Sequence, residues 1–247
     1  VEAGIRSGDM TMPEEINRIV TDSISDYFFT TSIWAKENLL KYGTESEKIH
    51  FVGNVMIDTL HQNLNRFLKP DIWDEYQLET QNYIVLTLHR PSNVDEETSL
   101  QKLLLGIDAL ANDKKVIFPI HPRTKAILGE QNLNLKNIIF VDPQGYLSFM
   151  YLIKNAFAVI TDSGGISEET TVLGIPCFTM RTTTERPETI SIGTNNLVGI
   201  SIENLVTIYT KFLHEGLKKS GIPELWDGKA SERIINILLN NYQEMLK

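Results

Sequence analysis

The chain has 247 residues, of which 42% are hydrophobic, and its formal net charge is −9 from 23 basic and 32 acidic residues. This length and apolar content allow one or two domains with buried cores. No block of basic residues stands out, which argues against nucleic acid as a partner, because binding of the phosphate backbone needs a Lys/Arg face.

Two further features of the composition bear on location. Cys177 is the single cysteine and lies in an apolar run. A lone cysteine cannot form an intramolecular disulfide, so a reduced, cytoplasmic compartment is the simplest interpretation. No apolar run approaches the roughly 18 residues that indicate a membrane span, and we expect no membrane partner.

The first 55 residues contain three strand-like runs, at 1–3, 27–30 and 49–52, separated by helix patterns. A sheet of about three strands cannot bury both of its faces under helices. We therefore expect 1–55 to be the second half of a Rossmann-like domain, with something preceding Val1.

Residues 56–228 are predicted to form a whole second domain. Apolar runs near 83–88, 116–120, 138–141, 158–161, 175–180 and 197–200 alternate with helix patterns. Continuous apolar strands that alternate with helices indicate an α/β fold, a doubly wound parallel sheet with helices on both faces. A last helix with an apolar stripe is expected within 229–247.

Polar residues follow four of the predicted strands at the point where each strand ends. They are His89-Arg90, His121, Asp162-Ser163-Gly164-Gly165 and Arg181. In open α/β sheets, ligands bind outside the carboxyl ends of the strands. The pattern predicts one cleft for an anionic ligand, although either histidine alone is equally consistent with a strand-end residue bonded to backbone.

The segment 162–169 predicts a phosphate site. Glycines let the backbone approach a phosphate, and the N–H groups at a helix N-terminus hold its charge. A carboxylate one turn into the helix can accept hydrogen bonds from a ribose diol, and Arg186 in the polar loop 182–188 can close on a pyrophosphate. The alternatives are an ordinary tight turn and an ordinary exposed loop.

Two carboxylates near the start of the chain suggest proton transfer. Glu14 and Arg18 lie four residues apart at a helix start, and Glu2 ends the first strand-like run. Paired carboxylates at one cleft can remove and return a proton, whereas Glu14 and Arg18 could also form a surface ion pair. No metal-ligand spacing is present, so we expect no metal site.

These motifs together resemble the non-hydrolysing UDP-N-acetylglucosamine 2-epimerases. The similar segments, in that family's order, are 1–9, 12–18, 52–54, 89–90, 121–122, 162–169 and 181–188. The resemblance implies a GT-B-like fold of two Rossmann-like domains with UDP-sugar between them, the N-terminal one incomplete here, and a final helix that returns to it. It also implies a cytoplasmic enzyme without a cofactor, commonly a homodimer, that supplies precursors of cell-surface polysaccharides.

The resemblance implies a reaction and roles for residues. UDP-N-acetylglucosamine would lose its C2 proton and UDP to give 2-acetamidoglucal, and UDP would then add back to give UDP-N-acetylmannosamine. Glu2, Glu14, Arg18 and His89 match catalytic positions. The matches to UDP-binding positions are Ser163, Gly164, Gly165, Glu169 and Arg186, and those to substrate or effector contacts are His121 and Arg90.

Two departures from the family pattern bear on activity. The segment that carries a further catalytic aspartate is absent before Val1, so we expect this chain alone to be inactive. Ser92 stands where the family has glutamate after His89-Arg90, which leaves the effector contacts open. The alternatives are a 2-epimerase of a UDP-2,3-diacetamido uronic acid, a hydrolysing 2-epimerase and a non-catalytic UDP-binding fragment.

Overall fold

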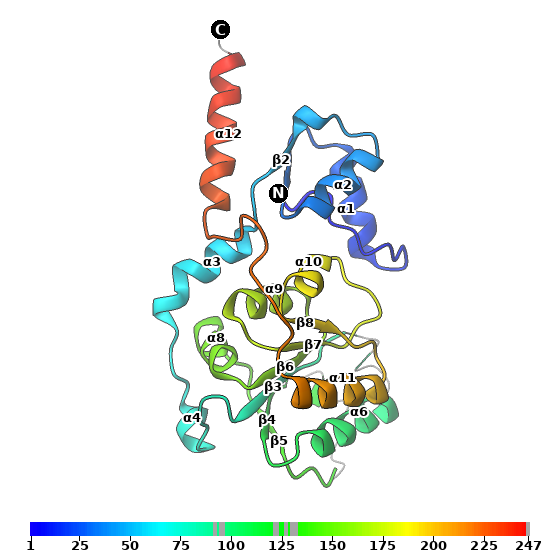
Figure 1. The fold of residues 1–247 in the computed structure, drawn as a ribbon, viewed down its shortest axis with the longest axis vertical. Helices are drawn as coiled ribbons and strands as arrows, with labels where there is room; N and C mark the ends of the chain where they lie inside the picture. The colour runs from blue at the N-terminus through cyan, green and yellow to red at the C-terminus, as the bar shows by residue number, and fades with distance from the viewer. Residues whose placement is uncertain (91–92, 94–96, 121–123, 126–127, 129–132, 246–247) are drawn as a thin grey trace. The chain divides into compact units, whose positions relative to one another are not determined.

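A computed structural model describes residues 1–90, 93, 97–120, 124–125, 128 and 133–245. The chain forms two compact units, each built from several segments (Figure 1). Unit 1 comprises Val1–Asn65, Thr183–Ile192 and Ile222–Lys247. Unit 2 comprises Arg66–Thr182 and Gly193–Gly221.

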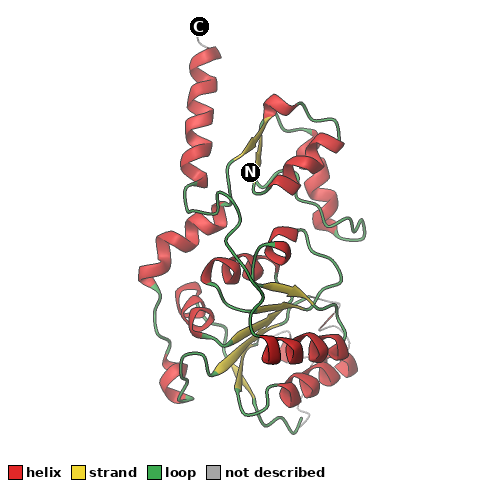
Figure 2. Ribbon diagram, viewed as in Figure 1, coloured by secondary structure: helices red, strands yellow, loops and turns green. Residues whose placement is uncertain are grey.

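Unit 2 contains a six-stranded, wholly parallel sheet (Figure 2). Its strands are β3 (Tyr83–Thr87), β4 (Lys115–Pro119), β5 (Ile138–Val141), β6 (Ala158–Thr161), β7 (Cys177–Thr179) and β8 (Asn195–Leu197). The spatial order is β5-β4-β3-β6-β7-β8. The six predicted strands and the doubly wound sheet are confirmed: two strands match their predicted ranges, and the ends of the others are shifted by at most three residues.

Helices cover both faces of this sheet (Figure 1). Among its described residues, the helices of unit 2 are α4 (Asp71–Glu75), α6 (Glu97–Leu110), α8 (Tyr146–Asn155), α9 (Gly164–Leu173) and α11 (Ile202–Glu215). Leu104 of α6 and Leu205 of α11 pack with Ile84 and Ile160 on one face. On the other face, the Tyr83 hydroxyl donates to the Leu152 carbonyl of α8.

Because both faces of the sheet are covered by helices, each strand appears in the sequence as a continuous apolar run. In β3, residues 83–86 are all fully buried, although consecutive side chains point to opposite faces. A strand covered on one face alone would tolerate polar residues at every second position. The sheet order reverses direction between β3 and β6, and this switch point is where open α/β sheets bind ligands.

Unit 1 holds two short parallel strands, β1 (Phe28–Thr30) and β2 (Ile49–Phe51). Its helices are α1 (Pro13–Ser23), α2 (Ile33–Lys41), α3 (Val55–Asn63), α10 (Pro187–Ser191) and α12 (Ala230–Met245). Short 3₁₀ turns lie at Ser46–Lys48 and Leu64–Arg66. The prediction of a strand at 1–3 is wrong: Ala3 donates one backbone hydrogen bond to Phe29 (3.1 Å), but a turn at Ala3-Gly4 ends the pairing.

Helix α12 is attached to α3 and to the end of β2. The buried carboxylate of Asp58 accepts hydrogen bonds from the backbone N–H groups of Ala230 (3.0 Å) and Ser231 (2.6 Å), and thereby caps the N-terminus of α12. Arg233 donates to the Val52 carbonyl (3.1 Å) and pairs with Asp227. Among the described residues, no helix is both long and apolar enough to cross a membrane.

Candidate active site

In unit 1, the loop before α1 is held by one buried carboxylate. Glu15 is 1% exposed, and it accepts hydrogen bonds from Ser7 N (2.9 Å), Ser7 Oγ (3.1 Å) and Gly8 N (3.0 Å). Arg18 Nη1 donates a further bond to Glu15 at 2.8 Å. Burial alone would raise the pKa of Glu15, but these donors outweigh burial and lower the pKa below its ordinary value. Glu15 therefore remains charged and fixes both the loop and Arg18.

The predicted ion pair between Glu14 and Arg18 is wrong. Arg18 pairs with Glu15, three positions away, and its Nη2 lies 4.0 Å from Glu185 Oε1. Glu14 is exposed and makes no hydrogen bond among the described residues. The two adjacent glutamates thus differ, because one faces the loop 5–8 and the other faces solvent.

Glu2, Arg18 and Arg186 line one cavity of about 320 Å³ within unit 1. Arg186 Nη2 lies 3.4 Å from Glu2 Oε2, although 184 positions separate the two residues. Glu2 has a left-handed backbone conformation (φ 57°), which is uncommon for a residue other than glycine and often occurs at functional sites. The cavity is lined by two guanidinium groups and by the carboxylates of Glu2, Asp22 and Glu185, so it presents charges of both signs to a ligand.

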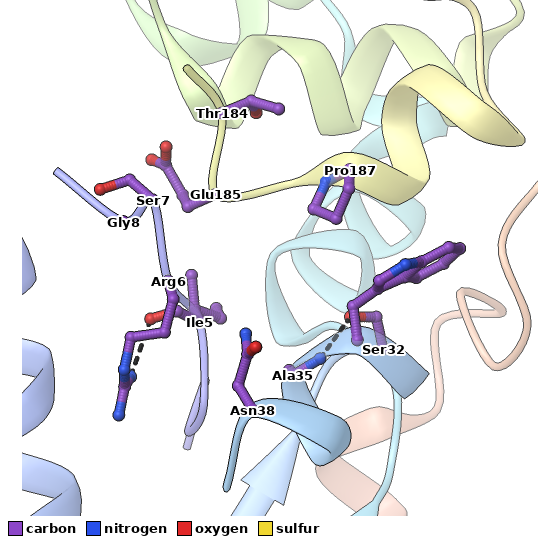
Figure 3. Close-up of a pocket in the computed structure, with 11 residues that line it drawn as sticks. Ile5, Arg6, Ser7, Gly8, Ser32, Ala35, Asn38, Thr184, Glu185 and Pro187 are labelled. Atoms are coloured by element: carbon purple, nitrogen blue, oxygen red, sulfur yellow. Dashed lines mark hydrogen bonds between the residues drawn. The ribbon is translucent and has the colours of Figure 1, made fainter. Parts of the chain in front are cut away.

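A second cavity of unit 1, of about 300 Å³, is enclosed by three segments (Figure 3). The segments are 5–8, the start of α2 and the loop 184–187. Ile5 and Glu185 line both cavities. Glu15 accepts hydrogen bonds from Ser7 and Gly8, which line this cavity, and from Arg18, which lines the first cavity. One buried carboxylate therefore supports the walls of both cavities.

The loop 183–192 is packed into unit 1 although its chain neighbours belong to unit 2. Glu188 is 1% exposed, and burial raises the pKa of its carboxyl, opposed by its own backbone N–H, Arg186 and Ser32. Arg186 is also buried. These buried charges anchor the loop and set the position of Arg186.

In unit 2, His89 and Asp162 meet at the switch point of the sheet. His89 Nδ1 lies 2.6 Å from Asp162 Oδ1, and the backbone N–H groups of His89 (3.0 Å) and Arg90 (2.9 Å) donate to Asp162 Oδ2. Asn93 Nδ2 donates to the same oxygen at 3.0 Å. Burial would raise the pKa of Asp162, but the hydrogen bonds from His89, Asn93 and Arg90 lower it overall. His89 follows β3, as predicted. Both its imidazole ring and its backbone N–H contact the Asp162 carboxylate.

Helix α9 begins at Gly164, directly after β6. Gly164 and Gly165 occupy its first turn, and the N-cap residue Ser163 makes no side-chain capping bond. Without side chains on the two glycines, the first N–H groups of the helix are accessible to an anion. The segment predicted to bind phosphate thus has the geometry for it, and its role stays a prediction.

Glu169 lies one turn further along α9 and is 6% exposed. Its Oε1 accepts a hydrogen bond from the Tyr146 hydroxyl at 3.0 Å. Burial raises the pKa of Glu169 to about 6, and the bond from Tyr146 offsets this only in part. The carboxyl is therefore close to its protonation midpoint, and a ribose diol would supply donors that it lacks.

Some predicted positions remain untested by geometry. His121 and Ser92 lie outside the described residues. Arg90 Nε donates to the Asp162 backbone carbonyl at 3.2 Å. The described residues include no group of three or more His, Cys, Asp or Glu side chains placed to hold a metal ion.

Two site carboxylates, Glu15 and Asp22, were not assigned from the sequence, and Asp162 was placed only at the predicted binding edge of the sheet. Asp22 accepts hydrogen bonds from Gly4 N (3.0 Å) and Arg6 Nη2 (2.6 Å), which fixes the turn after Glu2. The sequence carried a weak signal for Glu15, since a Ser-Gly loop beside a helix with two adjacent acids offers donors to one of them. Nothing local indicated the partners of Asp22.

Comparison with known proteins extends over nearly the whole chain. The family model described as UDP-N-acetylglucosamine 2-epimerase matches residues 1–239. A UDP-N-acetylglucosamine 2-epimerase of Methanocaldococcus jannaschii is 43% identical over 96% of this chain and 67% of its own length. A UDP-2,3-diacetamido-2,3-dideoxy-D-glucuronate 2-epimerase of Pseudomonas aeruginosa is 37% identical over 96% of this chain and 66% of its own length.

Solved structures agree with this match. The crystal structure of the Methanocaldococcus jannaschii enzyme in complex with UDP-GlcNAc and UDP superposes with a TM-score of 0.82, at 43% identity, over 97% of this chain and 68% of that one. The predicted α/β, GT-B-like fold is confirmed by these neighbours. The chain belongs to the UDP-N-acetylglucosamine 2-epimerase family.

Proposed function

We propose that this protein interconverts UDP-N-acetylglucosamine and UDP-N-acetylmannosamine at C2. The observation that carries the proposal is the unit 1 cavity lined by Glu2, Arg18 and Arg186, in a chain of this family. A carboxylate is a base that can reach a carbon-bound hydrogen, and two guanidinium groups can offset the charge of a departing pyrophosphate.

The proposed reaction runs through 2-acetamidoglucal. A carboxylate takes the C2 proton, the C1–C2 double bond forms, and the C1–O bond breaks so that UDP leaves with the electron pair. A carboxylic acid then returns a proton to the opposite face of C2, and a UDP oxygen attacks C1. Glu2 and Glu14 are the proposed acid and base, since proton removal and return on opposite faces require two groups.

We assign UDP binding mainly to unit 2. The first turn of α9 offers N–H groups to the diphosphate, and Glu169 offers an acceptor to the ribose diol. Arg186 of unit 1 stays a predicted contact to a pyrophosphate. The structural support is that the two glycines lie in the first turn of α9 and that buried Glu169 is held by the hydrogen bond from Tyr146.

Deuterium incorporation tests the chemistry directly. The complete product of the gene that encodes this chain is incubated with UDP-N-acetylglucosamine in deuterium oxide, and the sugar nucleotide is analysed by mass spectrometry. We expect one deuterium at C2 and formation of the manno epimer. Glu2→Gln and Glu14→Gln should each lower the rate of epimerisation about 10²- to 10⁴-fold, and absence of epimer and of exchange in the wild type contradicts the proposal.

The two glutamates are distinguished by the same measurement. Undiminished exchange in Glu14→Gln would remove Glu14 from the mechanism, in keeping with its exposed position, and would leave Glu2 as the main candidate. Undiminished exchange in Glu2→Gln would contradict the assignment of the cavity. Lys48→Ala, which lies in an exposed pair with Glu45, is the matched control and should exchange at the wild-type rate.

Thermal unfolding tests UDP binding in the 247-residue chain itself. At a UDP concentration about 100-fold above its dissociation constant, binding stabilises a protein by about 2.7 kcal/mol. This corresponds to a shift in Tm of several degrees, at roughly 2–4 °C per kcal/mol. Glu169→Ala and Arg186→Ala should each reduce the shift in Tm. If UDP shifted the Tm of both variants as much as it shifts that of the wild type, UDP would bind elsewhere.

The identity at 37% to a diacetamido uronate 2-epimerase supports a second candidate substrate. That sugar carries an acetamido group at C3 and a carboxylate at C6. Competition between the two sugar nucleotides in the exchange assay distinguishes the candidates. A homodimer in the cytoplasm stays a prediction, and sedimentation of the complete gene product would test the dimer.

A further inference from the structure

We propose that Asp162 is a positioning residue that fixes both the ring orientation and the tautomer of His89. Asp162 is fully buried, whereas the His89 side chain is 60% exposed. The two side chains are 2.6 Å apart at Nδ1 and Oδ1, although 73 positions separate the residues. The catalytic consequence of this contact rests on the proposed function, but the tautomer does not.

The hydrogen bonds around Asp162 leave one arrangement of protons. An ionised carboxylate only accepts, so each of its close neighbours must donate. His89 N, Arg90 N and Asn93 Nδ2 donate to Oδ2, and Asn93 Nδ2 also donates to the Met180 carbonyl. Oδ1 then receives the proton of His89 Nδ1. His89 consequently carries its proton on Nδ1 when neutral.

The outward nitrogen of His89 is therefore Nε2, and in the neutral ring it is an acceptor. It can take a proton from a ligand, and the ring then lies beside the buried carboxylate. An exposed histidine without such a partner would rotate and would exchange tautomers. Asp162 thus determines which ring atom a ligand meets and whether that atom accepts or donates.

Asp162→Asn should reverse this arrangement. The three donors at Oδ2 require an acceptor, so the amide oxygen of the new side chain takes that place. The NH₂ group then occupies the place of Oδ1 and faces His89 Nδ1. Because this group donates, Nδ1 must accept, and the proton of the neutral ring moves to Nε2.

Nitrogen NMR of the histidine rings tests the proposal in the chain as it stands. At a pH where the rings are neutral, we expect wild-type His89 to show a protonated Nδ1 and an unprotonated Nε2, and Asp162→Asn to show the opposite. A wild-type ring protonated at Nε2, or in the same tautomer mixture as exposed His214, would overturn the proposal. The wild-type spectrum alone is decisive if the variant does not fold.

Asp108→Asn is the matched control. Asp108 is also buried and accepts three backbone N–H bonds, from residues 136–138, but it contacts no imidazole. This variant should be destabilised in a similar way while His89 keeps its Nδ1 proton. A change in the His89 tautomer here would show that general loosening of unit 2 moves the proton, and would overturn the specific role of Asp162.

Activity of the complete gene product gives a second readout. In serine proteases, exchange of the aspartate behind the catalytic histidine for asparagine leaves the geometry intact but lowers kcat about 10⁴-fold through the wrong tautomer. We expect Asp162→Asn to lower kcat at least about a hundredfold with a small change in KM. An unchanged kcat with a reversed tautomer would overturn the catalytic consequence alone, and an inactive wild type with the Nδ1 tautomer would count against the proposed function alone.

Discussion

Glu15 of unit 1 and Glu169 of unit 2 are both buried, and their two carboxyls respond to burial in opposite ways. Glu15 in unit 1 has donors from Ser7, Gly8 and Arg18, and its pKa lies below the ordinary value. Glu169 in unit 2 has a hydrogen bond from Tyr146, and its pKa rises to about 6. The number of donors, rather than burial itself, decides the charge.

This difference matches two kinds of site. Unit 1 supports its cavities with loops, so a fixed charge is needed to hold backbone N–H groups in place. Unit 2 holds carboxyls of both kinds: Asp162 has several donors and a lowered pKa, whereas Glu169 has few donors and is available to a ligand. The hydrogen bonds around a buried carboxyl thus distinguish one that holds a loop in place, such as Glu15, from one that can still accept bonds from a ligand, such as Glu169.

The largest expected effect tests how strictly the loops of unit 1 are constrained. Gly4→Ala should lower the free energy of unfolding by about 3 kcal/mol or more, because a Cβ there would lie 2.1 Å from the Ala35 carbonyl oxygen in addition to the strain of a left-handed residue. Gly8→Ala is the control: it shares the φ of +76° but meets no atom within 4 Å, and should cost only about 1–2 kcal/mol. Equal losses in urea unfolding would contradict the steric argument.

Glu15→Gln should lower the free energy of unfolding at pH 7 by about 1.5–3 kcal/mol, the value of hydrogen bonds to a charged group. Because the pKa of Glu15 in the folded protein lies below its ordinary value of 4.5, its stabilisation is present above about pH 4.5 and is lost as the pH falls through the folded pKa. Urea unfolding of both proteins from pH 7 to pH 3 checks this. A difference that does not shrink on acidification would show that shape, not charge, holds the loop.

Glu169→Gln should change stability in the opposite direction to Glu15→Gln: it should raise the free energy of unfolding at pH 7 by up to about 2 kcal/mol. The pKa of Glu169 in the folded protein is about 6 against an ordinary value of 4.5. The wild type therefore loses stability as the pH rises from about 4.5 through 6, and the variant with the neutral amide does not. The variant should also bind UDP more weakly, because the amide offers one acceptor instead of two. Equal stability of the two proteins from pH 4 to pH 7 would refute the raised pKa.

The smallest effect is expected from an exposed pair of unit 1. Lys48 and Glu45 are 3.1 Å apart, with side chains 47% and 67% exposed. Lys48→Ala should change the free energy of unfolding by less than about 0.5 kcal/mol. A larger loss would mean that exposed charges also support unit 1, and would weaken the contrast between buried anchors and surface pairs.

The sequence by itself determined the sheet of unit 2 and the positions at its strand ends. A strand buried on both faces must be apolar throughout, so each run marks a strand and the polar residue after it marks the binding edge. His89 after β3 and Ser163 after β6 were identified in this way. These features depend on residues that are close in sequence, which is why they could be predicted.

Tertiary structure alone decided how the charged groups pair. The loop with Arg186 leaves the sheet of unit 2 and packs in unit 1, where it meets Glu2 across 184 positions. His89 meets Asp162 because β3 and β6 are neighbours at the switch point. Spacing along α1 favoured Glu14 as the partner of Arg18, but the donors of a folded loop selected Glu15. Such pairings depend on which segments the fold brings together, and no local pattern contains that information.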